Sequence, residues 1–122
     1  MRVVCAALAA SVALLGADAQ AQDVMAGRTT FAARCGVCHG IAAARSSPMA
    51  PSLKGVVGRR VAALPDFAYT AALKAKGGAW TPRALDAFLA SPMRVVPGSR
   101  MMTAVPDPAD RANLIAYLKT AK

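Results

Sequence analysis

The most reactive side chains in the sequence are two cysteines and a histidine within five consecutive positions, Cys35-Gly36-Val37-Cys38-His39. Cysteines at this spacing occur in redox-active dithiols, in zinc sites and in the C-x-x-C-H motif that attaches haem covalently. A dithiol of this kind needs a surrounding βαβ pattern, which the sequence lacks. A zinc site needs four ligands, and outside the first 21 residues the chain has only these two cysteines and one histidine. The pattern therefore favours haem attachment.

Haem attachment also explains the spacing of the motif. Two thiols must add to two vinyl groups on one edge of a porphyrin, and three positions along a helical turn bring Cys35 and Cys38 to the same side. The next residue, His39, then directs its imidazole towards the iron. We therefore expect one haem c, bound through both cysteines.

A second axial ligand cannot be another histidine, because His39 is the only one in the chain. A methionine thioether is the soft alternative, although a lone methionine is usually core filler. Met101 is favoured because Pro97 and Gly98 bend the backbone just before it, which lets a non-helical loop face a flat ligand. The other candidates are Met25, Met49, Met93 and Met102.

The elements that must position these residues are helices. We expect a helix over residues 22–34, with Gly27, Phe31 and Cys35 on one face. A glycine inside a helix costs about 1 kcal/mol relative to alanine, which suggests that another helix crosses closely at Gly27. Residues 40–64 show no sustained periodicity and are rich in Gly, Pro and Ser, so we expect a loop.

Three further helices are expected towards the C-terminus, and each has a recognisable boundary. The first covers residues 70–76 and stops at a Gly-Gly pair. The second starts at Thr81 as N-cap with proline next, and stops before Pro92. The third starts at Asp107 as N-cap, again followed by proline. The sequence thus predicts one all-α domain with long loops and a thin core. A buried macrocycle would stabilise such a core, and the alternative is a small helical bundle that packs modestly. The residues predicted to form the buried faces are Leu85, Phe88, Leu89, Leu114, Tyr117 and Leu118.

Composition narrows the class further. The 122 residues carry 15 Lys and Arg but only 6 Asp and no Glu, which gives a net charge of +9. This length excludes a doubly wound or barrel enzyme, and the few acidic residues offer no carboxylate pair for acid/base catalysis. Apolar residues make up 56% of the chain and are densest at its start.

Residues 1–21 have the form of a signal peptide, with Arg2 before an apolar stretch at 3–15 and an A-x-A site at 19–21. We expect cleavage after Ala21, which leaves a mature domain at 22–122 and a periplasmic location. The alternative is an apolar segment retained as an anchor, for which it is short. Removal of the segment leaves the net charge at +9, because Arg2 and Asp18 cancel.

Taken in order, these residues resemble class I cytochromes c, in particular the mitochondrial and alphaproteobacterial group. The resemblance spans the mature domain and implies the cytochrome c fold: three to five helices with long loops around one covalently bound haem, the first and last helices crossing. The residues that carry it are Gly27, Phe31, the motif 35–39, Pro51-Ser52-Leu53, Gly58-Arg59, Phe67-Ala68-Tyr69, Trp80, Pro97-Gly98-Ser99-Arg100-Met101 and Leu114-Ile115-Ala116-Tyr117-Leu118.

The resemblance also implies a role for each site residue. Cys35 and Cys38 would hold the haem through thioethers, and His39 and Met101 would be the axial ligands. The Pro51 carbonyl would accept the other imidazole N–H and orient the ring. Further haem contacts are implied for Arg59, Tyr69 and Trp80 at a buried propionate, for Ser99 at the second propionate, and for Phe88 beside Met101. The sequence departs from the family pattern at Ala50, Leu73, Met93, Met102 and Thr103.

With both axial positions filled, we expect a soluble one-electron carrier with a raised potential, not an enzyme. Its cationic surface would steer it to acidic docking faces on a quinol-oxidising complex, a dehydrogenase or a terminal oxidase, with Arg34, Arg94 and Arg100 as candidates. We expect a monomer with weak contact to anionic lipid and no nucleic-acid partner. The alternatives are a dedicated subunit that accepts electrons from one dehydrogenase, and a haem enzyme or gas sensor with a labile Met101.

Overall fold

The computed structural model describes residues 22–41 and 45–122, and within that part the regular elements are helices and one isolated antiparallel bridge, between Arg60 and Ala79. The helices are α1 (Val24–Arg34), α2 (Ala71–Lys76), α3 (Pro82–Ala90), α4 (Pro92–Val95) and α5 (Pro108–Thr120). This confirms the all-α prediction. No helix in the described part is long and apolar enough to cross a bilayer. The predicted signal peptide at 1–21 lies outside the described residues.

Four of the helices begin at a side chain that accepts hydrogen bonds from the free N–H groups of the first turn. Thr81 and Asp107, which the sequence predicted, cap α3 and α5. Asp23 and Thr70 do the same for α1 and α2. Such a cap stabilises a helix by about 1 kcal/mol. The sequence did not predict the four-residue helix α4, which starts at Pro92 directly after α3.

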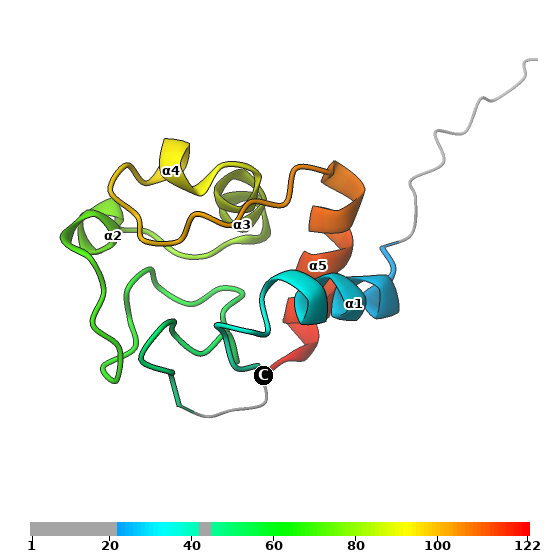
Figure 1. Cartoon of the computed structure of the whole chain (residues 1–122), viewed down its shortest axis with the longest axis horizontal. Coiled ribbons are helices and arrows are strands. Elements are labelled where there is room, and N and C mark those ends of the chain that lie inside the picture. Colours follow the sequence, from blue (N-terminus) through cyan, green and yellow to red (C-terminus); the bar gives the residue numbers. More distant parts are fainter. Residues whose placement is uncertain (1–21, 42–44) are drawn as a thin grey trace, which may run out of the picture.

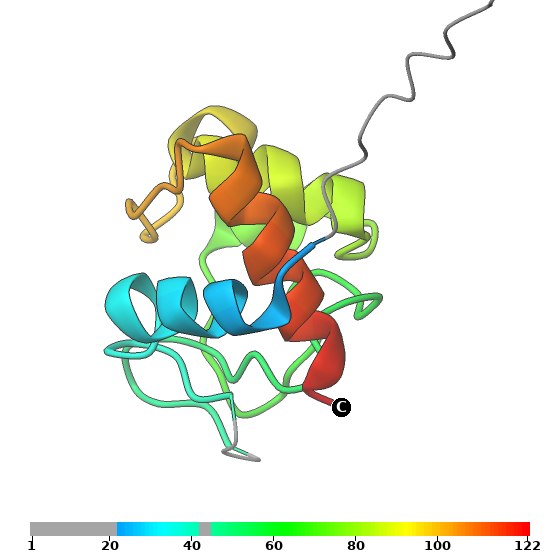
Figure 2. The same ribbon diagram turned by 90° about the vertical axis from the view of Figure 1, so that its right-hand side faces the viewer.

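The first and last helices cross, as Figures 1 and 2 show. At the crossing, a Cβ on Gly27 would lie 2.0 Å from the backbone oxygen of Asn113 and 2.9 Å from the Cβ of Tyr117. Only glycine permits this approach. The ring centroids of Phe31 and Tyr117 lie 5.6 Å apart beside it, within the range of favourable aromatic pairs. The close crossing predicted at Gly27 is therefore present.

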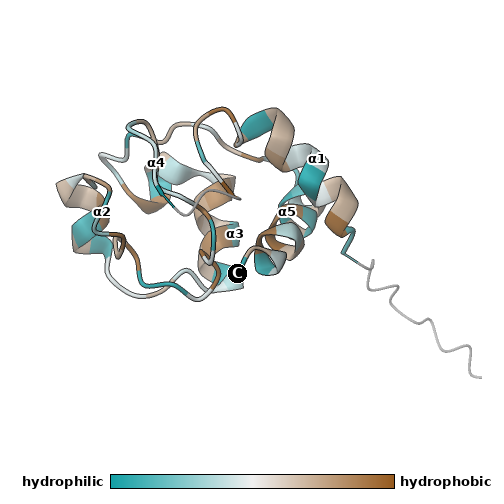
Figure 3. Cartoon of the chain, turned by 90° about the horizontal axis from the view of Figure 1, so that it is seen from below, coloured by the Kyte–Doolittle hydropathy of each residue, from teal (hydrophilic) through white to brown (hydrophobic). Residues whose placement is uncertain are grey.

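The core lies where α3 and α5 meet the long loop that runs from α1 to α2. Figure 3 shows apolar colour along most of α3, whereas α1 and α5 alternate between apolar and polar residues. Leu114 and Val105 are the most deeply buried large side chains, each 1% exposed. The core cluster consists of Phe31, Cys35, Val56, Trp80, Leu85, Phe88, Leu89, Val96, Val105, Leu114, Ile115 and Leu118.

Candidate functional site

A cavity of about 300 Å³ lies between the end of α1, the long loop, α3, α5 and the segment around Met101. Its size is at the lower end of the range for small-molecule sites, and its walls are mostly apolar, as is usual for such sites. The aliphatic residues that line it are Leu53, Val56, Leu73, Leu85, Leu89, Leu114 and Leu118. The cavity therefore offers a mostly apolar environment to a bound group.

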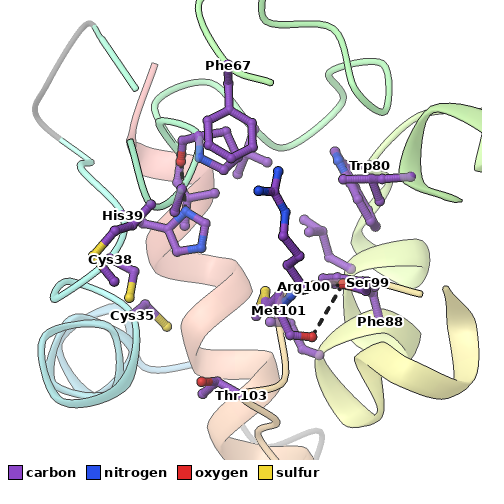
Figure 4. Close-up of a pocket in the computed structure, with 18 of the residues that line it drawn as sticks. Cys35, Cys38, His39, Phe67, Trp80, Phe88, Ser99, Arg100, Met101 and Thr103 are labelled. Carbon is purple, nitrogen blue, oxygen red and sulfur yellow. Dashed lines mark hydrogen bonds between the residues drawn. The ribbon is translucent and has the colours of Figure 1, made fainter. Parts of the chain in front are cut away.

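The end of α1 brings Cys35, Cys38 and His39 to one wall of this cavity (Figure 4). The helix continues into a turn in which the Cys35 N–H donates to the Phe31 carbonyl at 2.8 Å and the His39 N–H donates to the Cys35 carbonyl at 2.9 Å. Both cysteines are free thiols. Burial is the main cause that raises the pKa of the Cys35 thiol, which favours its neutral form.

The imidazole of His39 is held by the loop that follows it. Its Nδ1 lies 2.7 Å from the carbonyl oxygen of Pro51, the contact that the family resemblance implied. Because a carbonyl can only accept, Nδ1 carries the proton and Nε2 keeps its lone pair. Burial, the largest cause, and the Arg59 charge lower the pKa of His39, against the opposing effect of the Pro51 hydrogen bond. The ring is thus oriented with Nε2 free, and its environment favours the neutral form that binds a metal.

Met101 lies on the opposite side of the cavity from His39 (Figure 4). The turn before it needs Gly98, which has a φ of +90° and where an added Cβ would lie only 3.3 Å from the Cβ of Ala72. The Met101 N–H donates to the Ser99 hydroxyl at 3.1 Å, and its side chain packs against the core. The other four candidate methionines are exposed: Met25, Met49, Met93 and Met102.

Arg59, Tyr69 and Trp80 line the same cavity. The Arg59 guanidinium donates to the Ser52 carbonyl at 2.9 Å and to the Lys54 carbonyl at 3.1 Å. The Tyr69 hydroxyl accepts a hydrogen bond from the Leu64 N–H, so its proton is still available to another acceptor. The indole N–H of Trp80 has no hydrogen-bond partner among the described residues. These donors give the apolar cavity a cationic, donor-rich edge.

Two of the three predicted docking arginines are engaged within the molecule. Arg34 donates to the Ala104 carbonyl at 3.3 Å, and Arg100 donates to the Ala68 carbonyl at 2.6 Å. Arg94 is exposed on α4, and its guanidinium makes no hydrogen bond within the described part of the chain. Of the three, Arg94 is thus the side chain with all its donors available to a partner.

Sequence analysis assigned no site role to Phe67, although the family resemblance includes it, and did not predict the contact between Asp86 and Arg111. Phe67 lines the cavity and forms an edge-on pair with Tyr69, with ring centroids 5.0 Å apart. Asp86 and Arg111 form an ion pair, 2.7 Å between Oδ1 and Nε. The aromatic spacing around Tyr69 was a usable signal for Phe67, whereas no local pattern links Asp86 to Arg111, which lie 25 positions apart.

The donor set fits a haem. Two thiols and an imidazole on one wall, a thioether on the other, and an apolar space between them are what two covalent bonds and two axial ligands require. No cluster of three or more His, Cys, Asp or Glu side chains suited to binding a metal ion directly occurs in residues 22–41 and 45–122. The polar donors at Arg59, Tyr69 and Trp80 suit the carboxylates of a haem.

Comparison with known proteins identifies the same family that the sequence resembles. The sequence matches the family model described as Cytochrome c over residues 24–122. It is similar to the cytochrome c-type cyt cy of Rhodobacter capsulatus, with 43% identity over 80% of this chain and 49% of that protein. The match thus spans about half the length of that relative. It is also similar to cytochrome c2 of Agrobacterium tumefaciens, with 39% identity over 79% of this chain and 89% of the relative.

A solved structure shares the fold. Cytochrome cH from Methylobacterium extorquens superposes with a TM-score of 0.74 at 37% identity, over 80% of this chain and 98% of that chain.

Proposed function

Because the chain belongs to the cytochrome c family of electron carriers, which hold one covalently bound haem c, we propose that it shuttles single electrons between redox proteins of the periplasm. The observation that carries the proposal is the placement of His39 and Met101 on opposite sides of one apolar cavity. Two ligands from the protein would leave no open iron position for a substrate. A site closed in this way exchanges electrons and does not bind or transform small molecules.

In this proposal Cys35 and Cys38 would hold the haem through two thioether bonds, and His39 and Met101 would bind its iron. When bound, the haem supplies a one-electron couple between Fe(II) and Fe(III). The Pro51 carbonyl fixes the tautomer and the orientation of the His39 ring, which a ligand needs if it is to stay in place through both oxidation states.

The polar edge of the cavity has a different role in the proposal. Arg59, Tyr69 and Trp80 would donate hydrogen bonds to one haem propionate, and Ser99, which also lines the cavity, would hold the second. Arg59 is already oriented by two backbone carbonyls, so it loses little conformational freedom when it binds a carboxylate. The apolar walls and the neutral thioether of Met101 disfavour the additional charge of Fe(III), and we expect a positive midpoint potential.

The proposed location and partners rest on the sequence. The predicted signal peptide at 1–21 supports export to the periplasm, and the net charge of +9 supports partners with acidic docking faces. Electrostatic steering of this kind raises association rates and weakens with salt. We expect the rate of electron transfer to fall as ionic strength rises, and Arg94→Gln to reduce both the rate and its salt dependence. A rate independent of ionic strength would contradict the proposed docking.

Intact-mass measurement tests the attachment. The protein, made with haem-maturation machinery and exported, should gain the mass of one haem that persists after denaturation, on a chain that starts at Gln22. Replacing both Cys35 and Cys38 with alanine should abolish this gain. A wild-type protein that releases its haem on denaturation would contradict the proposal.

Carbon monoxide separates an electron carrier from an enzyme or gas sensor. The reduced carrier should bind carbon monoxide poorly at neutral pH because Met101 occupies the position that the gas would need. Rapid, tight binding by the wild-type protein would overturn the carrier proposal. Met101→Ala provides the positive control, since it should open that position.

A further inference from the structure

The segment that follows Met101 is anchored to the rest of the molecule by its backbone carbonyls. Arg111 Nη1 donates to the Val105 carbonyl at 2.9 Å and to the Pro106 carbonyl at 2.8 Å. The Val105 N–H donates in turn to the Leu89 carbonyl at 2.8 Å, and the Val105 side chain is 1% exposed. Residues 105 and 106 are therefore fixed against both α3 and α5.

Arg111 is fixed by a single acidic residue. Its Nε lies 2.7 Å from Oδ1 of Asp86 on α3, and its side chain is only 11% exposed. A buried guanidinium is costly unless its donors are paired, and a charged partner also sets its direction. The Asp86 side chain is 49% exposed, so water screens the pair and limits its contribution to overall stability. Orientation of Arg111 is the larger consequence of the contact.

Met101 lies between two anchors. On its N-terminal side, its own N–H is held by the Ser99 hydroxyl. On its C-terminal side, the Ala104 carbonyl accepts a hydrogen bond from Arg34 at 3.3 Å, and Val105 is the first residue anchored to both α3 and α5. Met102 and Thr103 are exposed and make no hydrogen bonds with other described residues. The position of the Met101 side chain in the cavity thus depends on the anchors at both ends of a short segment, in which Met102 and Thr103 add no hydrogen bond of their own.

We propose that the Asp86–Arg111 pair is a positioning device for Met101, which keeps the segment after the ligand against α3 and α5. The inference rests on the proposed function, since it assumes that Met101 is an axial ligand. Arg111 and Asp86 act only through the backbone of residues 105 and 106 and touch neither ligand. Weakening the pair should let the Met101 segment open while the rest of the fold stays intact.

The test uses the oxidised haem-loaded protein and imidazole as a competing ligand. Imidazole can replace Met101 only when the segment opens, so its apparent affinity reports the opening equilibrium. Asp86→Asn should strengthen imidazole binding about tenfold, which corresponds to about 1.4 kcal/mol. Arg111→Lys should have at least the same effect, because one ammonium cannot hold two carbonyls and a carboxylate in the geometry of a guanidinium.

Asp110→Asn is the matched control. It makes the same change of charge in the first turn of α5, but its carboxylate has no partner among the described residues. Its imidazole affinity should equal that of the wild type within about twofold. If Arg111→Lys does not fold, the comparison of Asp86→Asn with Asp110→Asn remains sufficient, because Asp86 is half exposed.

A second measurement separates positioning from general stability. On heating, the weak red absorption band of iron–sulfur ligation should disappear at a lower temperature than the helical circular dichroism in Asp86→Asn, with a wider gap than in the wild type. Equal imidazole affinities for the two Asp→Asn variants would overturn the positioning inference and leave the proposed function intact. The same holds if the difference between the two transition temperatures is unchanged in Asp86→Asn. Absence of the red band from the wild type would refute methionine ligation, and the inference with it.

Discussion

Replacing Gly27 with alanine probes the helix crossing on which the site is built. The new Cβ would lie 2.0 Å from the carbonyl oxygen of Asn113, 2.5 Å from its carbonyl carbon and 2.9 Å from the Cβ of Tyr117, where ordinary contact begins at 3.4 Å. The nearest atoms belong to backbone and cannot rotate away. The helices α1 and α5 must therefore separate by about 1 Å, which also disturbs the Phe31–Tyr117 ring pair.

The expected magnitude is a balance of two effects. Overpacking a well-packed contact costs about 1–3 kcal/mol, and a clash with backbone belongs at the upper end. Alanine regains about 1 kcal/mol of helix propensity over glycine. We therefore expect Gly27→Ala to lower the free energy of unfolding by about 2 kcal/mol, which lowers the melting temperature by about 10 °C in a domain of this size.

Thermal and urea unfolding of the haem-loaded protein, followed by far-ultraviolet circular dichroism, measures this change. Gly36→Ala is the matched control, because a Cβ there would meet its nearest neighbour, the Phe31 ring, at an ordinary 3.5 Å. It should change the free energy of unfolding by no more than about 0.5 kcal/mol. A Gly27→Ala protein as stable as the wild type would show that the two helices do not pack as closely as described.

Three further changes test other parts of the account. Thr81→Ala removes the acceptor for the Ala84 N–H and should lower the free energy of unfolding by about 1 kcal/mol in urea titrations; no change would contradict the assigned cap. Leu114→Ala, at a position 1% exposed, should cost about 2–5 kcal/mol by the same assay, and a loss below about 1 kcal/mol would contradict its place in the core. Two hydrogen bonds from Ser46 hold the pKa of the Asp66 carboxyl below its usual value of 3.8, so they stabilise the fold above that pH and are lost as the pH falls through the lower, folded-state pKa. Asp66→Asn should therefore be less stable than the wild type at neutral pH and equal to it in strong acid; a difference that persists in acid would refute this role.

Much of the fold could be predicted because its signals are local. The caps at Thr81 and Asp107 are read from neighbouring residues, since a cap bonds to an N–H only two or three positions away. Gly27 is informative for a related reason. A glycine destabilises its own helix, so its presence there indicates a compensating contact, here the close approach of another helix. The cysteine and histidine motif is local as well, because three reactive side chains share one helical turn.

The parts that could not be predicted depend on contacts between distant residues. The Asp86–Arg111 pair joins α3 to α5, and its two residues lie 25 positions apart in the sequence. Neither residue departs from the helical pattern of its neighbours, so no local signal marks the pair. The same limit applies to Arg34 and Arg100, whose bonds span 70 and 32 positions. Their charge and their positions beside the cysteine motif and the Met101 loop indicated docking residues, whereas in the structure both guanidiniums donate to backbone carbonyls of the protein itself.

Met101 lies between the features that local signals predict and those that depend on distant contacts. The Pro-Gly turn places two adjacent methionines in a suitable loop, and local rules favour Met101 without determining which side chain enters the cavity. In the structure Met102 is 76% exposed, while Met101 packs against the core. Its identity as the ligand remains a prediction.

The absorption spectrum of the oxidised, haem-loaded protein is the most direct test of the central claim that His39 and Met101 close both axial positions. The wild type should show the weak red band of iron–sulfur ligation. Met101→Ala should abolish the band, and Met102→Ala should leave it intact. The reverse pattern would assign the ligand to Met102, and a wild-type spectrum without the band would contradict the closed site on which the proposed electron carrier depends.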